Sequence, residues 1–237
     1  MNKINQAIIL AGGKGTRLRP ITHEIPKPLI PVGGQPIINY LVDLFYNHEV
    51  KDITVIVNED DLQDFKWWHK RYYSFGQNPE ISFYQEQGRL GTFGSLIDLK
   101  DELQDQFFLT NGDELKELNL DELTKFHYRK DVPATIALAK VENPEDYGVA
   151  ICENGFIKEF KEKPDNPPSN YISSGLYLLT PEVFEYHPGP GRFAMVEQNL
   201  FPNLAEEGRL GGFKFEGKWQ DTGTWQRYQK ALEKWGD

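Results

Sequence analysis

A glycine-rich turn close to the start of the chain is accompanied by basic side chains. Its glycines are Gly12, Gly13 and Gly15, and no Cβ stands between their backbone N–H groups and a ligand. The turn lacks both the P-loop and the G-x-G-x-x-G fingerprints, and a bare glycine pair would indicate only a tight turn. Exposed N–H groups and cations together suit a polyphosphate. The cations are Lys14, Arg17, Arg19 and Lys27, in a chain that is acidic overall.

A second candidate for chemistry is Asp113, in the segment Asn111-Gly112-Asp113. The segment follows the apolar run Phe107-Phe108-Leu109, which predicts a buried strand. An aspartate at the carboxyl end of a parallel strand is well placed to hold Mg²⁺, which binds one or two carboxylates together with phosphate oxygens. Taken alone, the same pattern is more often a cap at a strand-to-turn junction. A metal site therefore needs a second carboxylate from elsewhere in the chain.

Strand-like and helix-like stretches alternate through the first half of the chain and must position both groups. Strands joined by helices call for right-handed crossovers and an α/β fold, with a Rossmann-like, mostly parallel or mixed sheet covered by helices on both faces. Ligands bind beyond the carboxyl ends of such strands, where the loops 12–17, 86–91 and 111–115 are expected to converge. The expected strands are 6–11, 52–57, 81–86, 106–111 and 134–139, and the expected helices are 36–47, 60–73, 92–103 and 120–129.

The second half of the chain is less regular and predicts a smaller, substrate-facing sub-region. A polar, proline-rich link at 163–168 interrupts it. No repeat or flexible linker separates it from the first half, so we expect one compact unit. The expected strands of a mixed extension are 148–152, 155–160 and 171–179, and the expected helices are 181–186, 196–207 and 225–235.

Composition excludes several classes of function. The 237 residues are 39% hydrophobic with a formal net charge of −10, so the chain fits a globular domain and lacks the basic face of a nucleic-acid binder. The single cysteine, Cys152, excludes an intramolecular disulfide and fits a reducing compartment. No apolar run reaches membrane-spanning length, and the start lacks a signal-peptide core. We therefore expect a cytoplasmic protein without nucleic-acid or membrane partners.

The N-terminal turn is part of a longer pattern that resembles a known family. Residues 10–20 read L-A-G-G-K-G-T-R-L-R-P, and Pro26-Lys27-Pro28 follows them. Residue for residue, the two segments match the signature of the sugar-1-phosphate nucleotidyltransferases. The resemblance runs over nearly the whole chain and implies a single nucleotidyltransferase domain at 1–237, with a nucleotide-binding half at about 1–140 and a sugar-phosphate-binding half at about 141–237. It stops short of the β-helix repeats of larger members, so no C-terminal β-helix domain is expected.

The resemblance assigns the nucleotide and metal sites. Asp221 lies in W-Q-D-T-G-T, which matches the W-x-D-x-G-T element that supplies the family's second metal ligand. The resemblance therefore implies that Asp113 and Asp221 bind Mg²⁺. Glu86 and Gly91 match positions that read the nucleobase edge. The expected nucleotide-binding residues are Leu10, Ala11, Gly12, Gly13, Gly15, Thr16, Arg17, Glu86, Gly91, Thr92 and Gly112.

Further matches imply where the sugar phosphate binds. The segments Tyr147-Gly148-Val149 and Glu162-Lys163-Pro164 match the Y-G-V and E-K-P elements, which face the sugar phosphate in the family. Outside that context, Lys163 would be a solvated lysine of a charge-rich segment. Ser173 stands where relatives usually carry an asparagine, and its shorter side chain donates only one hydrogen bond. The expected sugar-phosphate-binding residues are Tyr147, Gly148, Glu162, Lys163, Ser173 and Trp219.

The implied reaction is nucleotidyl transfer, in which an oxygen of a sugar 1-phosphate attacks the α-phosphorus of a nucleoside triphosphate. The nucleophile is already an anion, so no general base is required, and acceleration must come from placement and charge neutralisation. The resemblance implies that Arg17 holds the departing pyrophosphate, Lys27 the α-phosphate and Lys163 the incoming phosphate. The expected catalytic residues are Arg17, Lys27 and Asp113.

Two other classes stay open from the sequence. One is a catalytically silent nucleotide-sugar-binding regulatory subunit on the same fold. The other is a cytidylyltransferase-like enzyme that acts on a non-sugar phosphate such as phosphocholine. The two metal carboxylates speak against the first class, and the Y-G-V and E-K-P elements speak against the second.

Within the family, the chain is most similar to mannose-1-phosphate guanylyltransferases, in the segments 167–172 and 201–210. GTP and mannose 1-phosphate are the expected substrates. Glucose-1-phosphate thymidylyl- or uridylyltransferase, heptose-1-phosphate guanylyltransferase and N-acetylmuramate-1-phosphate uridylyltransferase are the alternatives, because Phe93 and Ser95 replace the alanines of the family's L-G-T-A-G-A-L element. The aromatic residues in 65–73 are expected to lie on a half-buried amphipathic helix, and exposed ones could mark a homodimer contact.

Overall fold

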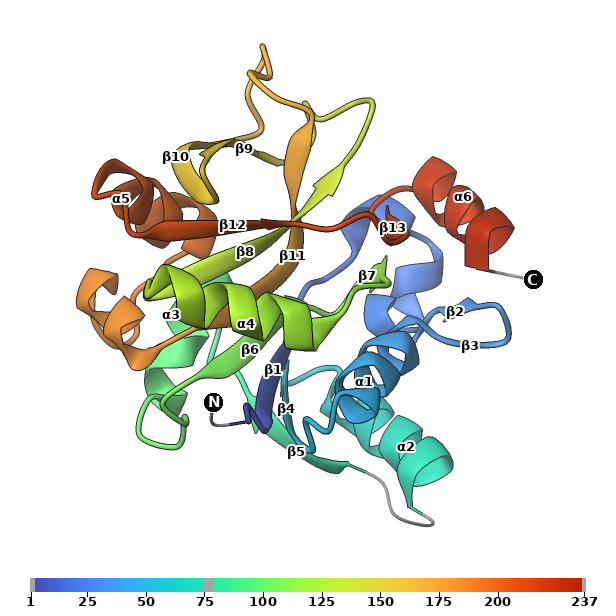
Figure 1. Ribbon diagram of the computed structural model, residues 1–237. Helices are drawn as coiled ribbons and strands as arrows, with labels where there is room; N and C mark the ends of the chain where they lie inside the picture. Colours follow the sequence, from blue (N-terminus) through green and yellow to red (C-terminus); the bar gives the residue numbers. More distant parts are fainter. Residues whose placement is uncertain (1–2, 75–78, 236–237) are drawn as a thin grey trace. The chain divides into compact units, whose positions relative to one another are not determined.

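The computed structural model describes residues 3–74 and 79–235 (Figure 1). The Cα atoms form two compact units. The first unit comprises Asn5–Gly88, Thr110–Glu117 and Gly217–Asp237. The second comprises Met1–Ile4, Arg89–Leu109 and Leu118–Glu216. Among the described residues, no helix has both the length and the apolar character needed to cross a membrane.

Three parallel strands form the sheet of the first unit. They are β1 (Gln6–Leu10), β4 (Asp52–Val57) and β5 (Glu80–Gln85), with β4 in the middle. Gln6 is paired with Asp52, and Asp52 with Glu80, so the three strands start level with one another. Ala7, Ile8 and Ile9 of β1 are buried, as expected for a strand with both faces covered. The predicted parallel arrangement of these strands is confirmed.

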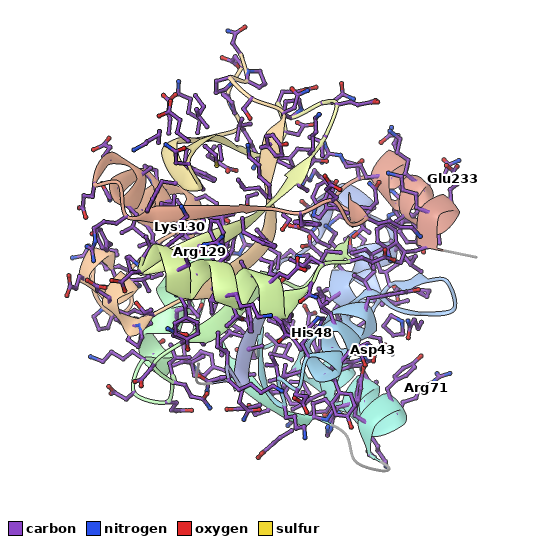
Figure 2. All side chains as sticks on the ribbon, in the orientation of Figure 1. Asp43, His48, Arg71, Arg129, Lys130 and Glu233 are labelled. Carbon is purple, nitrogen blue, oxygen red and sulfur yellow. The ribbon has the colours of Figure 1, made fainter. Side chains whose placement is uncertain are left out.

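Two amphipathic helices belong to the first unit, α1 (Ile37–Asn47) and α2 (Leu62–Tyr73) (Figure 1). In α2, Phe65 and Trp68 are buried, while Trp67 is 63% exposed. The Trp68 indole N–H donates to Asn39 Oδ1 of α1 at 2.7 Å. Arg71, labelled in Figure 2, lies over the ring of its neighbour Tyr72. The predicted half-buried amphipathic helix is confirmed.

Short elements complete the first unit. β7 (Glu114–Lys116) pairs antiparallel with β13 (Trp219–Asp221), and α6 (Trp225–Trp235) follows β13. β2 (Pro31–Val32) and β3 (Gln35–Pro36) form a second two-stranded pair. The sequence did not predict these four strands, because two or three residues are too few to show alternation. A buried cluster packs β7 and α6 against the segment after the glycine turn, through Leu18, Ile30, Val32, Ile37, Leu115 and Ala231.

The second unit contains a mixed sheet in the order β11-β8-β12-β10-β9. β12 runs parallel to β8, whereas the other neighbouring pairs are antiparallel. Helix α4 (Leu120–Lys130) precedes β8 in the chain. The α/β class with a mixed extension is thus confirmed. The strands are β8 (Ala134–Lys140), β9 (Gly148–Glu153), β10 (Phe156–Glu162), β11 (Tyr171–Leu179) and β12 (Leu210–Lys214).

Strand β12 was not predicted, because Gly211 and Gly212 break its apolar pattern. Its neighbours explain the glycines: a Cβ on Gly211 would lie 2.6 Å from Thr135 Oγ1, and one on Gly212 would lie 2.5 Å from Cys152 Sγ. Both distances are shorter than atomic contact allows. The glycines therefore bring the backbone of β12 close to its neighbours, which sequence periodicity cannot reveal.

The predicted helix 92–103 is wrong in extent. The structure has a single helical turn, α3 (Gly91–Gly94), followed by the 3₁₀ helix η4 (Ser95–Leu99). The N–H groups of Phe93 and Gly94 donate to the carbonyl of Ala194 rather than to a preceding helical turn. The predicted helix 196–207 is likewise divided into a π-helical turn, η6 (Val196–Leu200), and α5 (Phe201–Glu206). Strand β6 (Phe107–Asn111) and the 3₁₀ helix η5 (Pro181–Tyr186) lie within one residue of the predicted bounds.

Candidate active site

The glycine turn of the first unit begins where β1 ends. Gly15 has a φ of 56°, in the left-handed region that favours glycine, and a Cβ there would lie 2.8 Å from Thr22 Cγ2. Its carbonyl accepts hydrogen bonds from the Leu18 N–H and the Thr22 hydroxyl, both at 2.9 Å. Glu86 lies close to the start of the turn, because a Cβ on Gly12 would be 3.0 Å from Glu86 Oε2. The predicted nucleobase reader Glu86 is therefore adjacent to the glycine turn.

Gly112 fixes the next segment against the end of β1. Its N–H donates to the Leu10 carbonyl at 2.9 Å, and a Cβ at this position would lie 2.8 Å from the same oxygen. A larger residue would push the two backbones apart. The close contact places Asp113, the next residue, beside the glycine turn.

Lys27 forms an ion pair with Asp113. Lys27 begins the 3₁₀ helix η3 (Lys27–Leu29) and is 8% exposed, and its ammonium group donates to Asp113 Oδ2. Burial raises the pKa of Asp113, but the nearby ammonium groups of Lys27 and Lys116 outweigh that effect and lower it below its usual value. Asp113 is therefore a carboxylate at neutral pH.

The β7–β13 ladder brings the second acidic residue to the same place. Asp221 is the cross-strand partner of Glu114, and the Thr222 hydroxyl donates to the Asp113 carbonyl at 2.8 Å. Asp221 Oδ1 accepts from the Gly223 N–H at 2.8 Å and from Arg227 at 3.3 Å. Asp113 directly precedes Glu114, the first residue of β7 and the cross-strand partner of Asp221. The two aspartates are therefore close at the β7–β13 pair, although more than a hundred residues separate them in the sequence.

Arg17 also lies beside Asp221. A Cβ on Gly223 would be 2.8 Å from Asp221 Oδ1 and 3.2 Å from Arg17 Nη2, so both groups border one glycine. The first unit therefore gathers the glycine turn and the residues predicted to be catalytic. These residues are Arg17, Lys27 and Asp113.

Several residues that support this cluster were missed in the sequence. Glu114 accepts from the Asn111 amide at 2.9 Å and from the Trp219 indole at 3.0 Å. Burial raises the pKa of Glu114, and burial lowers the pKa of its neighbour Lys116. Lys116 donates to the Thr110 hydroxyl at 3.0 Å. A charged pair next to Asp113 was visible in the sequence, but nothing in its spacing indicated that both groups are buried.

Trp219 belongs to the first unit, although it was expected among the sugar-phosphate residues. The Trp219 indole N–H donates a hydrogen bond to Glu114 Oε2. The indole thus ties β13 to β7 next to the two acidic residues. A role of its ring toward the sugar phosphate stays a prediction.

The donor set fits a divalent cation. Mg²⁺ binds through one or two carboxylates and takes its remaining ligands from phosphate oxygens and water. Asp113, directly before β7, and Asp221, on the paired strand β13, supply two carboxylates. Lys27 forms an ion pair with Asp113, and Arg227 forms one with Asp221. Among the residues that the structure describes, no group of three or more His, Cys, Asp or Glu side chains gathers into a complete protein metal site.

The second unit gathers four of the predicted sugar-phosphate residues at the β9–β10 pair. Glu162 is the cross-strand partner of Gly148, and the Lys163 N–H donates to the Tyr147 carbonyl at 3.0 Å. The Lys163 side chain is 60% exposed, and its ammonium lies 3.1 Å from Glu162 Oε1. Lys163 has a φ of 47°, which is uncommon for a lysine and fixes the direction in which the chain leaves the strand. This geometry fits a lysine presented to a ligand.

Thr92 and Ser173 lie in the second unit, and hydrogen bonds connect both of them to Glu197, a residue that the sequence analysis did not identify. The Thr92 hydroxyl donates to Glu197 Oε2 at 2.8 Å. The Ser173 hydroxyl donates to the Tyr177 hydroxyl at 3.2 Å, and Tyr177 donates to Glu197 Oε1 at 3.5 Å. Glu197 is 9% exposed. No motif pointed to it, since a single glutamate within a helical pattern is normally on the surface.

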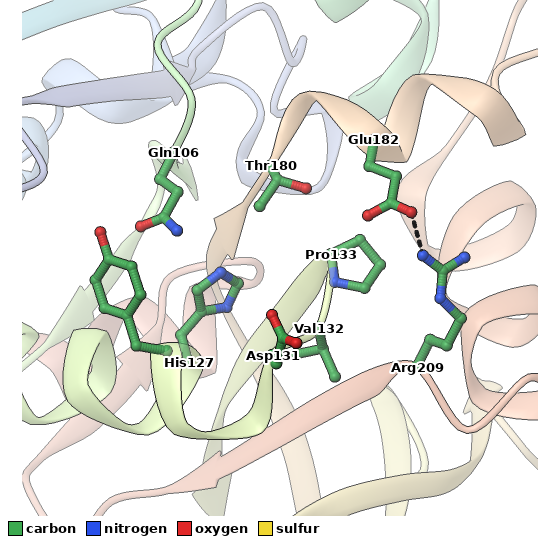
Figure 3. Close-up of a pocket in the computed structure, with 9 residues that line it drawn as sticks. Gln106, His127, Asp131, Val132, Pro133, Thr180, Glu182 and Arg209 are labelled. Atoms are coloured by element: carbon green, nitrogen blue, oxygen red, sulfur yellow. Dashed lines mark hydrogen bonds and ion pairs between the residues drawn. The ribbon is translucent and has the colours of Figure 1, made fainter. Parts of the chain in front are cut away.

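A small cavity of the second unit is lined by none of the predicted site residues (Figure 3). It measures about 120 Å³, and Gln106 Oε1 and Thr180 Oγ1 are buried beside it without a hydrogen-bond partner among the described residues. Ligand pockets usually measure about 300–1,000 Å³. A nucleotide does not fit this cavity, and its polar lining suits water.

The chain is similar in sequence to known proteins. The mannose-1-phosphate guanyltransferase of Schizosaccharomyces pombe is 36% identical over 233 residues, which cover 94% of this chain and 62% of that protein. The mannose-1-phosphate guanyltransferase of Saccharomyces cerevisiae is 38% identical over 230 residues, which cover 92% of this chain and 61% of that protein. The chain thus spans about three fifths of the length of these relatives.

The fold is also similar to a solved structure. A Bacillus anthracis protein, assigned as a glucose-1-phosphate thymidylyltransferase and crystallised with sucrose, superposes with a TM-score of 0.88 at 28% identity. The superposition covers 98% of this chain and 95% of that chain, and it confirms the mixed α/β nucleotidyltransferase fold. The family model for nucleotidyl transferases matches residues 6–237. The chain therefore belongs to the nucleotidyl transferase family.

Proposed function

We propose that the protein condenses a nucleoside triphosphate with a sugar 1-phosphate to give a nucleotide sugar and pyrophosphate, and that its substrates are GTP and mannose 1-phosphate. The observation that carries the proposal is the arrangement at the β7–β13 pair: Asp113 directly precedes β7, and Asp221 ends the paired strand β13. Lys27 lies beside Asp113, and Arg17 lies beside Asp221. This cluster suits phosphates, because it joins cations with a pair of carboxylates that can bind a metal ion. A simple binding protein would not need both carboxylates.

The reaction forms one P–O bond and breaks another. An oxygen of the sugar phosphate bonds to the α-phosphorus, and the bond from the α-phosphorus to the oxygen that bridges it to the β-phosphorus breaks. Pyrophosphate carries away the electron pair of the broken bond. Lys27 would hold the α-phosphate and Arg17 the departing pyrophosphate. Charge-assisted hydrogen bonds of this kind stabilise the transition state without a proton transfer.

A divalent cation is expected to take part, because members of this family generally use one. Asp113 and Asp221 would hold Mg²⁺. When bound, the ion would act as a Lewis acid toward a phosphoryl oxygen. Lys27 and Arg227 have a second task in this proposal: they form ion pairs with Asp113 and Asp221 and orient the two carboxylates.

The nucleotide and the sugar phosphate would meet different elements. The glycine turn would bind the triphosphate through its backbone N–H groups, and Glu86 would read the base. In the second unit, Tyr147, Gly148, Glu162 and Lys163 would contact the sugar phosphate. Lys163 would bind the acceptor phosphate, because its side chain is exposed and its uncommon backbone angle sets the direction in which the chain leaves β10.

The choice of GTP and mannose 1-phosphate is supported by the relatives of Schizosaccharomyces pombe and Saccharomyces cerevisiae. We further propose that the protein acts in the cytoplasm, where the half-buried thiol of Cys152 would stay reduced. We also propose a homodimer that buries the exposed Trp67 of α2. Light scattering with the variant Trp67→Ser tests the dimer, since a dimeric variant would contradict that contact.

A screen of pyrophosphate release tests the function. It pairs GTP, UTP, dTTP, CTP and ATP with mannose, glucose, heptose and N-acetylmuramate 1-phosphates and with phosphocholine, in the presence of Mg²⁺. We expect the highest kcat/KM for GTP with mannose 1-phosphate. Nucleotide binding without pyrophosphate release from any pair would identify a silent binding protein instead.

A further inference from the structure

A buried carboxylate connects the two hydroxyl groups predicted to contact the substrates in the second unit. Glu197 accepts from Thr92 with one oxygen and from Tyr177 with the other. Ser173 joins the network through Tyr177. Since Thr92 belongs to the predicted nucleotide site and Ser173 to the predicted sugar site, Glu197 links the two sites within one unit.

The local backbone is built around this residue. Glu197 lies in the π-helical turn η6, a rare geometry that often occurs at functional sites. The Val196 N–H donates to the Thr92 hydroxyl at 3.0 Å, so that hydroxyl is held by backbone as well as by the carboxylate. Tyr177 is only 1% exposed, and a buried tyrosine hydroxyl requires a partner.

Glu197 accepts both hydrogen bonds, one with each oxygen, and this sets the direction of the network. The Tyr177 hydroxyl donates to Glu197 and accepts from Ser173. The Ser173 oxygen also accepts from the Gly175 N–H at 3.2 Å. A hydroxyl has one proton to donate and two lone pairs to accept with. Among the described residues, Ser173 and Thr92 each donate one hydrogen bond and accept one. Each keeps one lone pair for a ligand.

We propose that Glu197 is a positioning and specificity-determining residue that makes Ser173 and Thr92 hydrogen-bond acceptors toward the substrates. The proposal rests on the proposed function. Ser173 then selects a sugar that donates a hydroxyl proton at the facing position, and Thr92 selects an N–H or O–H group of the nucleotide. The asparagine usual in relatives could donate or accept, whereas this serine can only accept.

Steady-state kinetics of three variants test the network. Tyr177→Phe separates Ser173 from the carboxylate but leaves the Thr92 contact, so the KM for the sugar 1-phosphate should rise about tenfold while the KM for the triphosphate stays within about twofold. Glu197→Gln should raise both KM values, because one of the two accepting oxygens becomes a donating NH2 group and the other becomes a neutral, weaker acceptor. Gln198→Ala, at the exposed next position of the same turn, is the control and should leave both KM values unchanged.

The double variant Glu197→Gln/Tyr177→Phe completes the cycle. If the two residues act on Ser173 through one network, its KM for the sugar 1-phosphate should not exceed that of Glu197→Gln. Additive effects would overturn the proposal. So would a Tyr177→Phe protein that melts at a lower temperature but keeps both KM values, because that result means a purely structural role. If Glu197→Gln fails to fold, the Tyr177→Phe and Gln198→Ala comparisons decide.

Substrate analogues test the direction of the hydrogen bond at Ser173. Replacement of a sugar hydroxyl by hydrogen removes both donor and acceptor, whereas replacement by fluorine removes the donor alone. At the position that faces Ser173, we expect the fluoro and deoxy sugar 1-phosphates to have equally raised KM values. A fluoro analogue with a KM close to that of the parent sugar would show that Ser173 donates and would overturn the proposal. No pyrophosphate release by the wild type would refute the proposed function instead.

Discussion

Lys27→Met removes the cation that pairs with Asp113 and should lower kcat far more than it lowers stability. Two unit charges about 4 Å apart interact by about 4 kcal/mol at an effective dielectric constant of about 20, which corresponds to a factor of about 10³ in rate. Removal of a single donor aimed at a developing anion costs a comparable factor of about 10²–10³ in other active sites. We therefore expect kcat to fall by about 10²–10³.

The stability of Lys27→Met should fall much less. The Asp113 side chain is 35% exposed, so water solvates much of the charge that Lys27 leaves behind. The free energy of unfolding should fall by about 1–2 kcal/mol, well below the 3–5 kcal/mol typical of a fully buried broken pair.

Pyrophosphate release and chemical denaturation measure the two effects separately. Lys66→Met is the matched control, since Lys66 is an exposed lysine of α2 in the same unit, and both quantities should stay at their wild-type values. A Lys27→Met enzyme whose kcat is within about threefold of the wild type would refute the electrostatic reasoning.

Three further predictions concern Gly112, Lys163 and His127. Gly112→Ala should lower the free energy of unfolding by about 1–3 kcal/mol and reduce kcat, because its Cβ would meet the Leu10 carbonyl at 2.8 Å; equal stability in denaturant would contradict this contact. Lys163→Ala should raise the KM for the sugar 1-phosphate and leave the KM for the triphosphate unchanged, whereas Lys161→Ala, the control, should change neither. His127 is buried against the Thr135 hydroxyl, and burial lowers its pKa to about 4. Its folded pKa lies below the unfolded value of about 6.5, so the unfolded chain binds the proton first and stability should fall by up to about 3 kcal/mol between pH 6.5 and pH 4. The variant His127→Gln should lose this part of the pH dependence of stability. If its stability changed with pH as in the wild type, the assignment to His127 would be contradicted.

The regular strands and helices were predictable because their apolar residues repeat with a clear period. The strands 52–57 and 171–179 and the helix 225–235 agree with the structure to the residue. The short strands β7 and β13 were not predictable, although they carry the acidic cluster. Their pairing depends on contacts across the chain, and three residues have no period to detect.

Part of the candidate site also followed from the sequence. The signature around the glycine turn and Asp113 identified the residues that the first unit gathers. Glu197 was different, because its importance comes from burial and from partners distant in the sequence, Thr92 and Tyr177. The buried pair of Glu114 and Lys116 escaped notice for the same reason. The catalytic and binding roles of the individual residues stay predictions.

Whether Asp113 and Asp221 form one metal site can be measured by the binding of a divalent ion. Mn²⁺ can replace Mg²⁺ and be counted by electron paramagnetic resonance in the presence of a non-hydrolysable GTP analogue. Mn²⁺ and the analogue are first titrated without protein, because the nucleotide binds the ion by itself. We expect one additional tightly held ion per wild-type chain, and its loss in both Asp113→Asn and Asp221→Asn with the fold intact. Equal ion binding by the wild type and both variants would contradict the claim that these two carboxylates form one site.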